Sequence, residues 1–217
     1  MSKREIELVV ISDVHLGTYG CHANELLNYL QSIKPKTLVL NGDIIDAWQF
    51  SKSYFPANHM QVIKQIFELL SSGTKVYYLT GNHDEMLRRF SNLEIGNLIL
   101  DDKVVLNLDG EKAWIFHGDV FDSSTTGSAK FIAKLGGKGY DLLIILNRII
   151  NFILNKFGRE KMSFSKKIKN SVKKAVSFID NFETTAAEIA IDNGYKYVVC
   201  GHIHQPQIRE VTNEKEK

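Results

Sequence analysis

Histidine and acidic side chains recur in five short motifs along this chain. The motifs read S-D-V-H-L-G, N-G-D-I-I-D, G-N-H-D, H-G-D and G-H-I-H, and they carry Asp13, His15, Asp43, Asn82, His83, Asp84, His117, Asp119, His202 and His204. Imidazole nitrogens together with carboxylate and amide oxygens are ligands for divalent ions such as Mn, Fe, Zn or Mg. The lack of thiolates in this set argues against a cysteine-based structural zinc site.

Each motif taken alone has an ordinary structural explanation, because Gly, Asn and Asp are common turn residues. Turn chemistry does not need histidine, however, and five of the seven histidines of the chain stand in these motifs. In extended chain, D-x-H and H-x-H place both side chains on the same side of the backbone. We therefore interpret the five motifs together as parts of one metal site.

The segments that must position these residues are short apolar runs, at 6–11, 37–40, 75–79, 104–108, 113–116 and 196–200. Most runs are continuous rather than alternating, as in strands that are buried on both faces. Amphipathic helices are expected between the first three runs, at about 23–33 and 60–70, which gives a right-handed parallel α/β sheet. Ligands bind at the carboxyl ends of such strands, and each motif follows one of the runs.

Length and composition are those of a folded protein with one sizeable core. The 217 residues are 44% hydrophobic and 24% charged, and their formal net charge is +2. We expect a single domain over residues 1–217. Two cysteines, Cys21 and Cys200, cannot form a disulfide framework, and the N-terminal segment lacks the apolar stretch of a secretory signal. A cytoplasmic protein is therefore expected.

Residues 131–181 contain no strand-like run and are predicted to form a helical lid inserted into the domain. Segment 140–157 is apolar around most of its helical circumference, and 156–174 carries eight lysines and arginines against one glutamate. A basic amphipathic helix beside an apolar one is typical of an element at an anionic membrane surface. The alternatives are a helix wedged between two others and a solvated lysine-rich face. Nucleic acid is not expected as a partner, because the segment lacks interleaved arginine and aromatic residues.

The ordered set D-x-H, G-D, G-N-H-D, H-G-D and G-H-x-H resembles the signature of the calcineurin-like metallophosphoesterases over nearly the whole chain. The resemblance implies a four-layer α/β/β/α sandwich with a centre of two divalent metal ions bridged by Asp43. Manganese is favoured, with Fe, Zn or Mg as alternatives. The further ligands implied are, for one ion, Asp13, His15 and His204, and for the other, Asn82, His117 and His202.

The same resemblance implies that a metal-bound hydroxide hydrolyses a phosphate ester or anhydride. His83 stands where this family steadies the transition state and protonates the leaving oxygen, and Asp84 would orient its imidazole. Substrate contacts are expected from Asn82, His83 and Asp122. Asp119 and Asp122 are also expected to support the site.

Within the superfamily, these motifs and the predicted lid look most like the UDP-2,3-diacylglucosamine hydrolases. That resemblance implies cleavage of the pyrophosphate of UDP-2,3-diacylglucosamine during lipid A synthesis, by a protein held peripherally at the inner face of the membrane through its lid. Well-known members have Arg where this chain has His83, so a similar nucleotide-linked lipid is kept as a substrate. The alternatives are a generic soluble phosphodiesterase or nuclease of the same superfamily and a catalytically silent binding scaffold.

Overall fold

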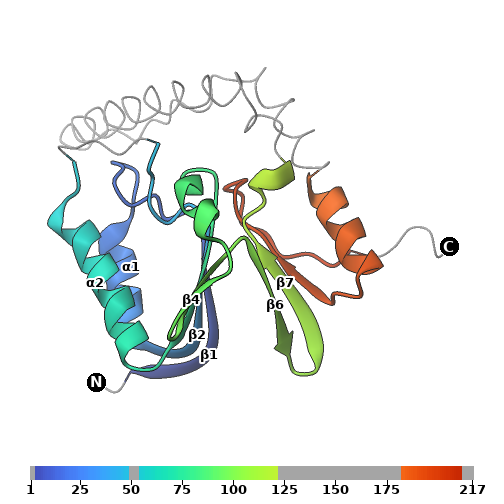
Figure 1. Cartoon of the computed structure of the whole chain (residues 1–217), viewed down its shortest axis with the longest axis horizontal. Helices are drawn as coiled ribbons and strands as arrows, with labels where there is room; N and C mark the ends of the chain where they lie inside the picture. Colours follow the sequence, from blue (N-terminus) through green and yellow to red (C-terminus); the bar gives the residue numbers. More distant parts are fainter. Residues whose placement is uncertain (1–2, 49–53, 122–181, 212–217) are drawn as a thin grey trace, which may run out of the picture.

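The computed structural model of the chain describes residues 3–48, 54–121 and 182–211. The predicted lid at 131–181 and Asp122 lie outside these residues. The described part forms four layers: two helices, a five-stranded sheet, a three-stranded sheet and a helical segment at 182–192 (Figure 1). This arrangement confirms the predicted α/β/β/α sandwich.

The larger sheet has the strand order β1-β2-β3-β5-β4. All neighbouring strands are parallel except β4, which pairs antiparallel with β5. The parallel arrangement of the first three strands follows the prediction from the apolar runs. The strands are β1 (Arg4–Ile11), β2 (Ile33–Asn41), β3 (Lys75–Leu79), β4 (Leu93–Ile95) and β5 (Leu98–Asp101).

Two helices cover the outer face of this sheet (Figure 1). Helix α1 (Ala23–Ser32) lies between β1 and β2 in the chain, and α2 (Ala57–Ser71) lies between β2 and β3. Helix α1 ends one residue earlier than expected, because Ile33 has extended backbone and begins β2 opposite Arg4 of β1.

The smaller sheet has the strand order β6-β7-β8. Strands β6 (Lys103–Leu108) and β7 (Glu111–Phe116) form an antiparallel hairpin, and β8 (Tyr197–Val199) pairs parallel with β7. The carboxyl ends of β7 and β8 therefore point the same way. Two short 3₁₀ helices, η1 (Glu85–Phe90) and η2 (Asp119–Phe121), follow the G-N-H-D and H-G-D motifs.

Strand β2 is buried on both faces, which explains its continuous apolar run. Leu38 and Leu40 pack in the cluster under the two helices, whereas Val39 packs with Leu79 and Ile115 in a cluster that joins the two sheets. Val39, Leu79 and Ile115 are fully buried. These contacts fix the distance between the sheets, and with it the distance between their strand ends.

The helical segment at 182–192 covers the outer face of the smaller sheet (Figure 1). Phe182 and Ala186 are buried in one cluster with Trp114 and Phe116 of β7. Within the described residues, no helix has both the length and the apolar character needed to cross a membrane.

Replacing Ile115 with Ala tests whether the contact between the sheets stabilises the fold. Ile115 is fully buried, so Ile115→Ala removes apolar contacts and leaves a cavity, which should lower the free energy of unfolding by about 2–5 kcal/mol. Urea denaturation measures the change. The matched control is Ile95→Ala on the edge strand β4, where the side chain is 60% exposed and a change of about 0.5 kcal/mol or less is expected. Equal losses in both variants would contradict this account of the core.

Candidate metal centre

Backbone hydrogen bonds hold the loops after the strands against one another. The N–H of Asp13 donates to the carbonyl oxygen of Gly42 at 3.1 Å, and the N–H of His15 donates to that of Asp43 at 2.9 Å. In the smaller sheet, the N–H of Gly201 donates to the carbonyl oxygen of His117 at 2.8 Å. The first two motifs, and likewise the last two, are therefore fixed relative to each other at the strand ends.

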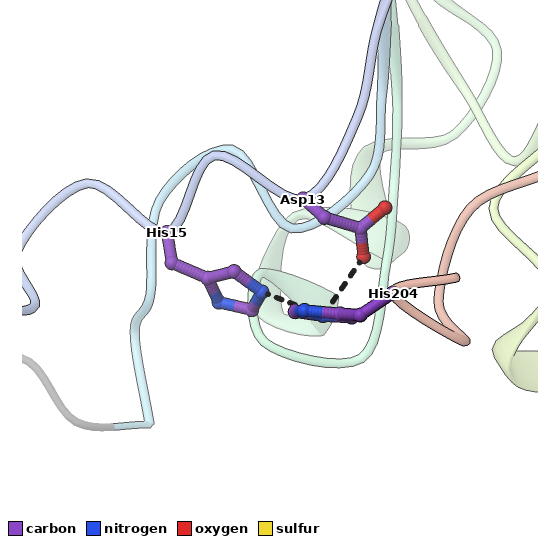
Figure 2. Close-up of side chains that lie close together, drawn as sticks. All are labelled: Asp13, His15 and His204. Carbon is purple, nitrogen blue, oxygen red and sulfur yellow. Dashed lines mark hydrogen bonds and ion pairs between the residues drawn. The ribbon is translucent and has the colours of Figure 1, made fainter. Parts of the chain in front are cut away.

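One cluster contains Asp13, His15 and His204, whose side chains point toward one another (Figure 2). His204 Nε2 lies 3.3 Å from Asp13 Oδ1 and 3.2 Å from His15 Nε2. These atoms come from opposite ends of the chain and lie within 4.8 Å of one another. A single cation could contact all three.

A second cluster contains Asp43, His117 and His202, and Asp43 also groups with His15 and His83. His117 Nε2 lies 3.2 Å from Asp43 Oδ2, while the Nε2 atoms of His15 and His83 lie 3.9 and 4.0 Å from the same oxygen. Asp43 is 1% exposed. Its carboxylate thus lies between the two clusters, where a shared ligand would have to be.

Further contacts hold the histidines of the second cluster in place. The backbone N–H of His202 donates to both carboxylate oxygens of Asp13, at 3.1 and 3.2 Å. His117 Nδ1 lies 3.0 Å from the carbonyl oxygen of Asn41 and must donate to it, because a carbonyl only accepts. In the protonated ring, Nε2–H therefore faces Asp43, whereas in the neutral ring Nε2 carries the lone pair that could bind a cation.

The side chain of Asn82 has a buried polar atom that lacks a hydrogen-bond partner among the described residues. The side chain is 5% exposed, and its Oδ1 is buried without a hydrogen-bond partner among the described residues. Buried polar atoms without partners are rare and costly in native proteins. An amide oxygen, carboxylates and imidazoles fit a hard or borderline divalent ion, so these residues suit the metals expected from the sequence.

The electrostatics of the site favour a cation. Burial alone would raise the pKa of Asp43 and Asp13, but hydrogen bonds from His117 and His204 and the charges of the imidazoles hold both pKa values below their usual range. Burial lowers the pKa of His117, yet the hydrogen bond and charge of Asp43 raise it to about 9. The hydrogen bond to Asp13 raises the pKa of His204. Both carboxylates are therefore ionised at neutral pH and are accompanied by positive charge.

Backbone strain is concentrated at the same residues. Asp13, His15, Asp43, His202 and His204 all have φ between 50 and 72°, in the left-handed region that residues with a Cβ rarely adopt. Such conformations cost free energy and persist where the surrounding structure enforces them, most often at functional sites.

At two positions in the motifs, only glycine lets the backbone lie close to a carboxylate of the centre. A Cβ on Gly81 would lie 2.2 Å from Asp43 Oδ1, and a Cβ on Gly201 would lie 2.5 Å from Asp13 Oδ2. Any other residue at either position would push a carboxylate away from the centre.

Asp46, which sequence reasoning missed, orients two of the histidines. Its Oδ2 lies 2.8 Å from His83 Nδ1 and 3.3 Å from His15 Nδ1, and the side chain is buried. Both imidazoles therefore have their Nε2 atoms free to face the centre. The available signal was the second aspartate of N-G-D-I-I-D, three residues after Asp43.

Asp84 has a different contact from the one expected. It was predicted to orient His83, but its carboxylate accepts hydrogen bonds from the backbone N–H groups of Ile44 and Gly81, at 3.0 and 2.6 Å, and from the hydroxyl of Tyr78 at 2.7 Å. Burial raises the pKa of Asp84. Asp84 thus ties the loop after β2 to the loop after β3, and Asp46 makes the contact with His83.

Asp119 and Asp122 are the remaining candidates from the sequence. Asp119 is buried and pairs with Arg88, whose Nη2 donates to its Oδ2 at 3.0 Å. Arg88 also donates through Nε to Asp102 Oδ1 at 3.0 Å. Asp119 therefore helps to hold η2 to η1, while Asp122 lies outside the described residues.

His83 carries a further contact, because the ring of Trp48 stacks on its imidazole with centroids 4.6 Å apart.

The chain is similar to one protein family and to several known proteins. The family model described as calcineurin-like phosphoesterase matches residues 6–206. A UDP-2,3-diacylglucosamine hydrolase from Aliivibrio fischeri (strain MJ11) is 28% identical over 214 residues, which cover 96% of this chain and 86% of that protein. A protein of the same name from Enterobacter sp. (strain 638) is 27% identical, covering 93% of this chain and 83% of that protein. A solved structure of a protein of unknown function from Aquifex aeolicus aligns with a TM-score of 0.34 and 19% identity, over 52% of this chain and 61% of that chain.

Replacing Gly81 with Ala tests whether close approach at the centre matters for metal binding. The added Cβ would meet Asp43 Oδ1, so Gly81→Ala should weaken Mn²⁺ binding by about 10- to 100-fold in a calorimetric titration. Gly96→Ala is the matched control, because no atom lies within 4 Å of its new Cβ. Its φ of +57° predicts a small loss of stability without a change in metal affinity. Unchanged Mn²⁺ affinity in Gly81→Ala would show that Asp43 is not held against Gly81 as described.

Proposed function

The chain belongs to the calcineurin-like phosphoesterase family, and from this membership we propose that it hydrolyses the pyrophosphate of UDP-2,3-diacylglucosamine or a similar nucleotide-linked lipid. The observation that carries the proposal is the position of the Asp43 carboxylate between two clusters of ligand atoms. The printed names of the relatives, which match over most of this chain, support the choice of substrate.

We assign the candidate ligands to two divalent ions, with Asp43 shared between them. Two bound ions lower the pKa of a water between them and offset the negative charge of a phosphoryl group under attack. Manganese is our preferred metal, since the ligands are nitrogen and oxygen atoms without sulfur. The remaining ligands in this assignment are Asp13, His15 and His204 for one ion, and Asn82, His117 and His202 for the other.

His83 is our candidate for the group that steadies the transition state and protonates the leaving oxygen. Burial lowers the pKa of its imidazole, but the hydrogen bond with Asp46 and the charges of Asp43 and Asp46 raise the pKa above its usual value. Asp46 Oδ2 lies 2.8 Å from Nδ1, so when the ring is protonated on both nitrogens, the proton on Nε2 faces the centre. The stack with Trp48 restricts the rotation of the ring. The proton donor is thereby oriented before substrate binds.

We further propose one domain over residues 1–217, located in the cytoplasm and held peripherally at the inner face of the membrane. Support for membrane attachment comes from the lipid part of the proposed substrate and from the basic composition of 156–174, a segment outside the described residues. Asn82 and His83 are proposed to contact substrate, because His83 groups with His15 and Asp43 and its backbone N–H donates to Asp43, and Asn82 is its neighbour in the chain.

The substrate assignment is tested with purified protein and Mn²⁺. Wild-type protein should release UMP from UDP-2,3-diacylglucosamine much faster than it cleaves bis-p-nitrophenyl phosphate, and Asp43→Ala should abolish both reactions, because it removes the carboxylate shared by the clusters. Release of UMP is measured by chromatography. Cleavage of the generic diester without release of UMP would overturn the lipid substrate and favour a generic phosphodiesterase. No hydrolysis of either compound by Mn²⁺-loaded protein would favour a silent scaffold.

The role of His83 is tested with uridine 5′-phosphodiesters of phenol and of p-nitrophenol. His83→Gln should lower kcat by about 10²- to 10⁴-fold for the phenyl ester, whose leaving oxygen needs a proton, and by less for the p-nitrophenyl ester. Asp46→Asn should cause a smaller loss, because it weakens the contacts that orient His83 and His15 but removes neither imidazole. Metal content, measured by mass spectrometry, should stay at the wild-type level in His83→Gln. Equal losses on both esters would show that His83 does not act as the proton donor.

A further inference from the structure

A polar cavity of about 330 Å³ lies beside the loop that carries Asp13 and His15. Its walls come from that loop, from the N-terminal turn of α1 and from the start of α2. None of the candidate metal ligands lines it. Ligand pockets measure roughly 300–1,000 Å³, so this cavity suits one moiety of a lipid-linked substrate and not the whole molecule.

His59 presents a hydrogen-bond donor to this cavity. The side chain is 2% exposed, and its Nδ1 accepts the backbone N–H of Gly17 at 2.9 Å. Burial lowers the pKa of His59, which favours the neutral imidazole. The neutral ring then carries its proton on Nε2. His59 lines the cavity, and no hydrogen bond joins its Nε2 to another of the described residues.

The other walls offer aromatic and amide groups. The rings of Tyr19 and Tyr54 stack with centroids 3.8 Å apart. Asn58 Nδ2 donates to Asn24 Oδ1 at 3.1 Å, which leaves further donor and acceptor positions on both amides. Glu25, in the first turn of α1, brings a carboxylate to the rim.

These groups restrict the chemistry of the occupant. The polar walls do not suit an acyl chain. The carboxylate of Glu25 disfavours a phosphate, because like charges repel each other. A neutral ring with hydrogen-bonding edges fits the donor of His59, and nucleobases stack on tyrosine rings. A carboxylate such as that of Glu25 can accept hydrogen bonds from ribose hydroxyls.

We propose that this cavity binds the nucleoside of the substrate, with the base against the wall formed by Tyr19, Tyr54 and His59. The inference rests on the proposed function, because it assumes a nucleotide-linked substrate. Thr18 closes the loop through hydrogen bonds from its N–H and Oγ1 to the carbonyl oxygen of His15, at 3.2 and 2.9 Å. The cavity wall at Tyr19 therefore follows directly on the segment that places His15 in the first cluster.

The test uses the full chain loaded with Mn²⁺ and two probes, UMP and inorganic phosphate, titrated by calorimetry. Tyr19→Ala and His59→Gln should each lower the affinity for UMP by about tenfold or more, which is the loss expected for one stacked base. Both variants should lower the affinity for phosphate less. The matched control is Tyr29→Ala on α1, because Tyr29 is 38% exposed, like Tyr19 at 36%, and does not line the cavity. It should change neither affinity.

The nucleoside site would be overturned if both pocket variants lost affinity for UMP and for phosphate to the same extent. It would also be overturned if neither variant lost affinity for UMP. Glucosamine 1-phosphate is titrated in the same way, and a selective loss of its affinity, with UMP affinity unchanged, would assign the cavity to the sugar and overturn the nucleoside site. Hydrolysis of UDP-2,3-diacylglucosamine with wild-type KM in both variants would overturn the site while leaving the proposed function intact. Selective loss of UMP binding in a chain that does not cleave this lipid would support the site and overturn the proposed substrate.

Discussion

Burial of the Asp43 carboxylate among imidazoles is the constraint on which the rest of the centre depends. A buried carboxylate loses its contacts with water, and protein groups must replace them. For Asp43 these groups are the backbone N–H of His83, which donates at 2.8 Å, and the imidazole of His117, whose Nε2 lies 3.2 Å away. These partners follow strands of different sheets, β3 and β7. The charge of Asp43 can therefore be accommodated only when the two sheets are packed together, which makes the site a property of the whole sandwich.

The packing between the sheets also supports the strain at the site. Left-handed backbone at five ligand candidates costs free energy at each position, of order 1–3 kcal/mol. Val39, Leu79 and Ile115 fill the space between the sheets directly below the loops, and they are fully buried. Hydrogen bonds of Asp84 to Ile44 and Gly81 then lock the loops themselves. The strain persists because relaxing one loop would unpair groups in its neighbours.

Sequence reasoning identified the strands and the residues at their ends, because continuous apolar runs and histidines next to Gly and Asp are local signals. It could not assign contacts between loops. The adjacent Asp84 was the natural candidate for orienting His83, but Asp84 turns toward Tyr78 and the backbone, and Asp46 reaches the imidazole from the loop after β2. Strands β4 and β5 were also missed, since β4 is exposed at the sheet edge and β5 is only partly buried, so neither carries a continuous buried run.

One loop serves both the candidate centre and the proposed nucleoside cavity, and it is fixed at both ends. Asp13 and His15 are held by backbone hydrogen bonds to Gly42 and Asp43, and Gly17 is held by His59. A loop fixed in this way sets the distance between a bound phosphorus atom and a bound base. In the proposed binding mode, a substrate in which a phosphate is joined to a nucleoside would occupy both the centre and the cavity, whereas other phosphodiesters would occupy only the centre. Specificity for the nucleotide half would then come from a rigid part of the fold, because preorganised groups lose little entropy on binding.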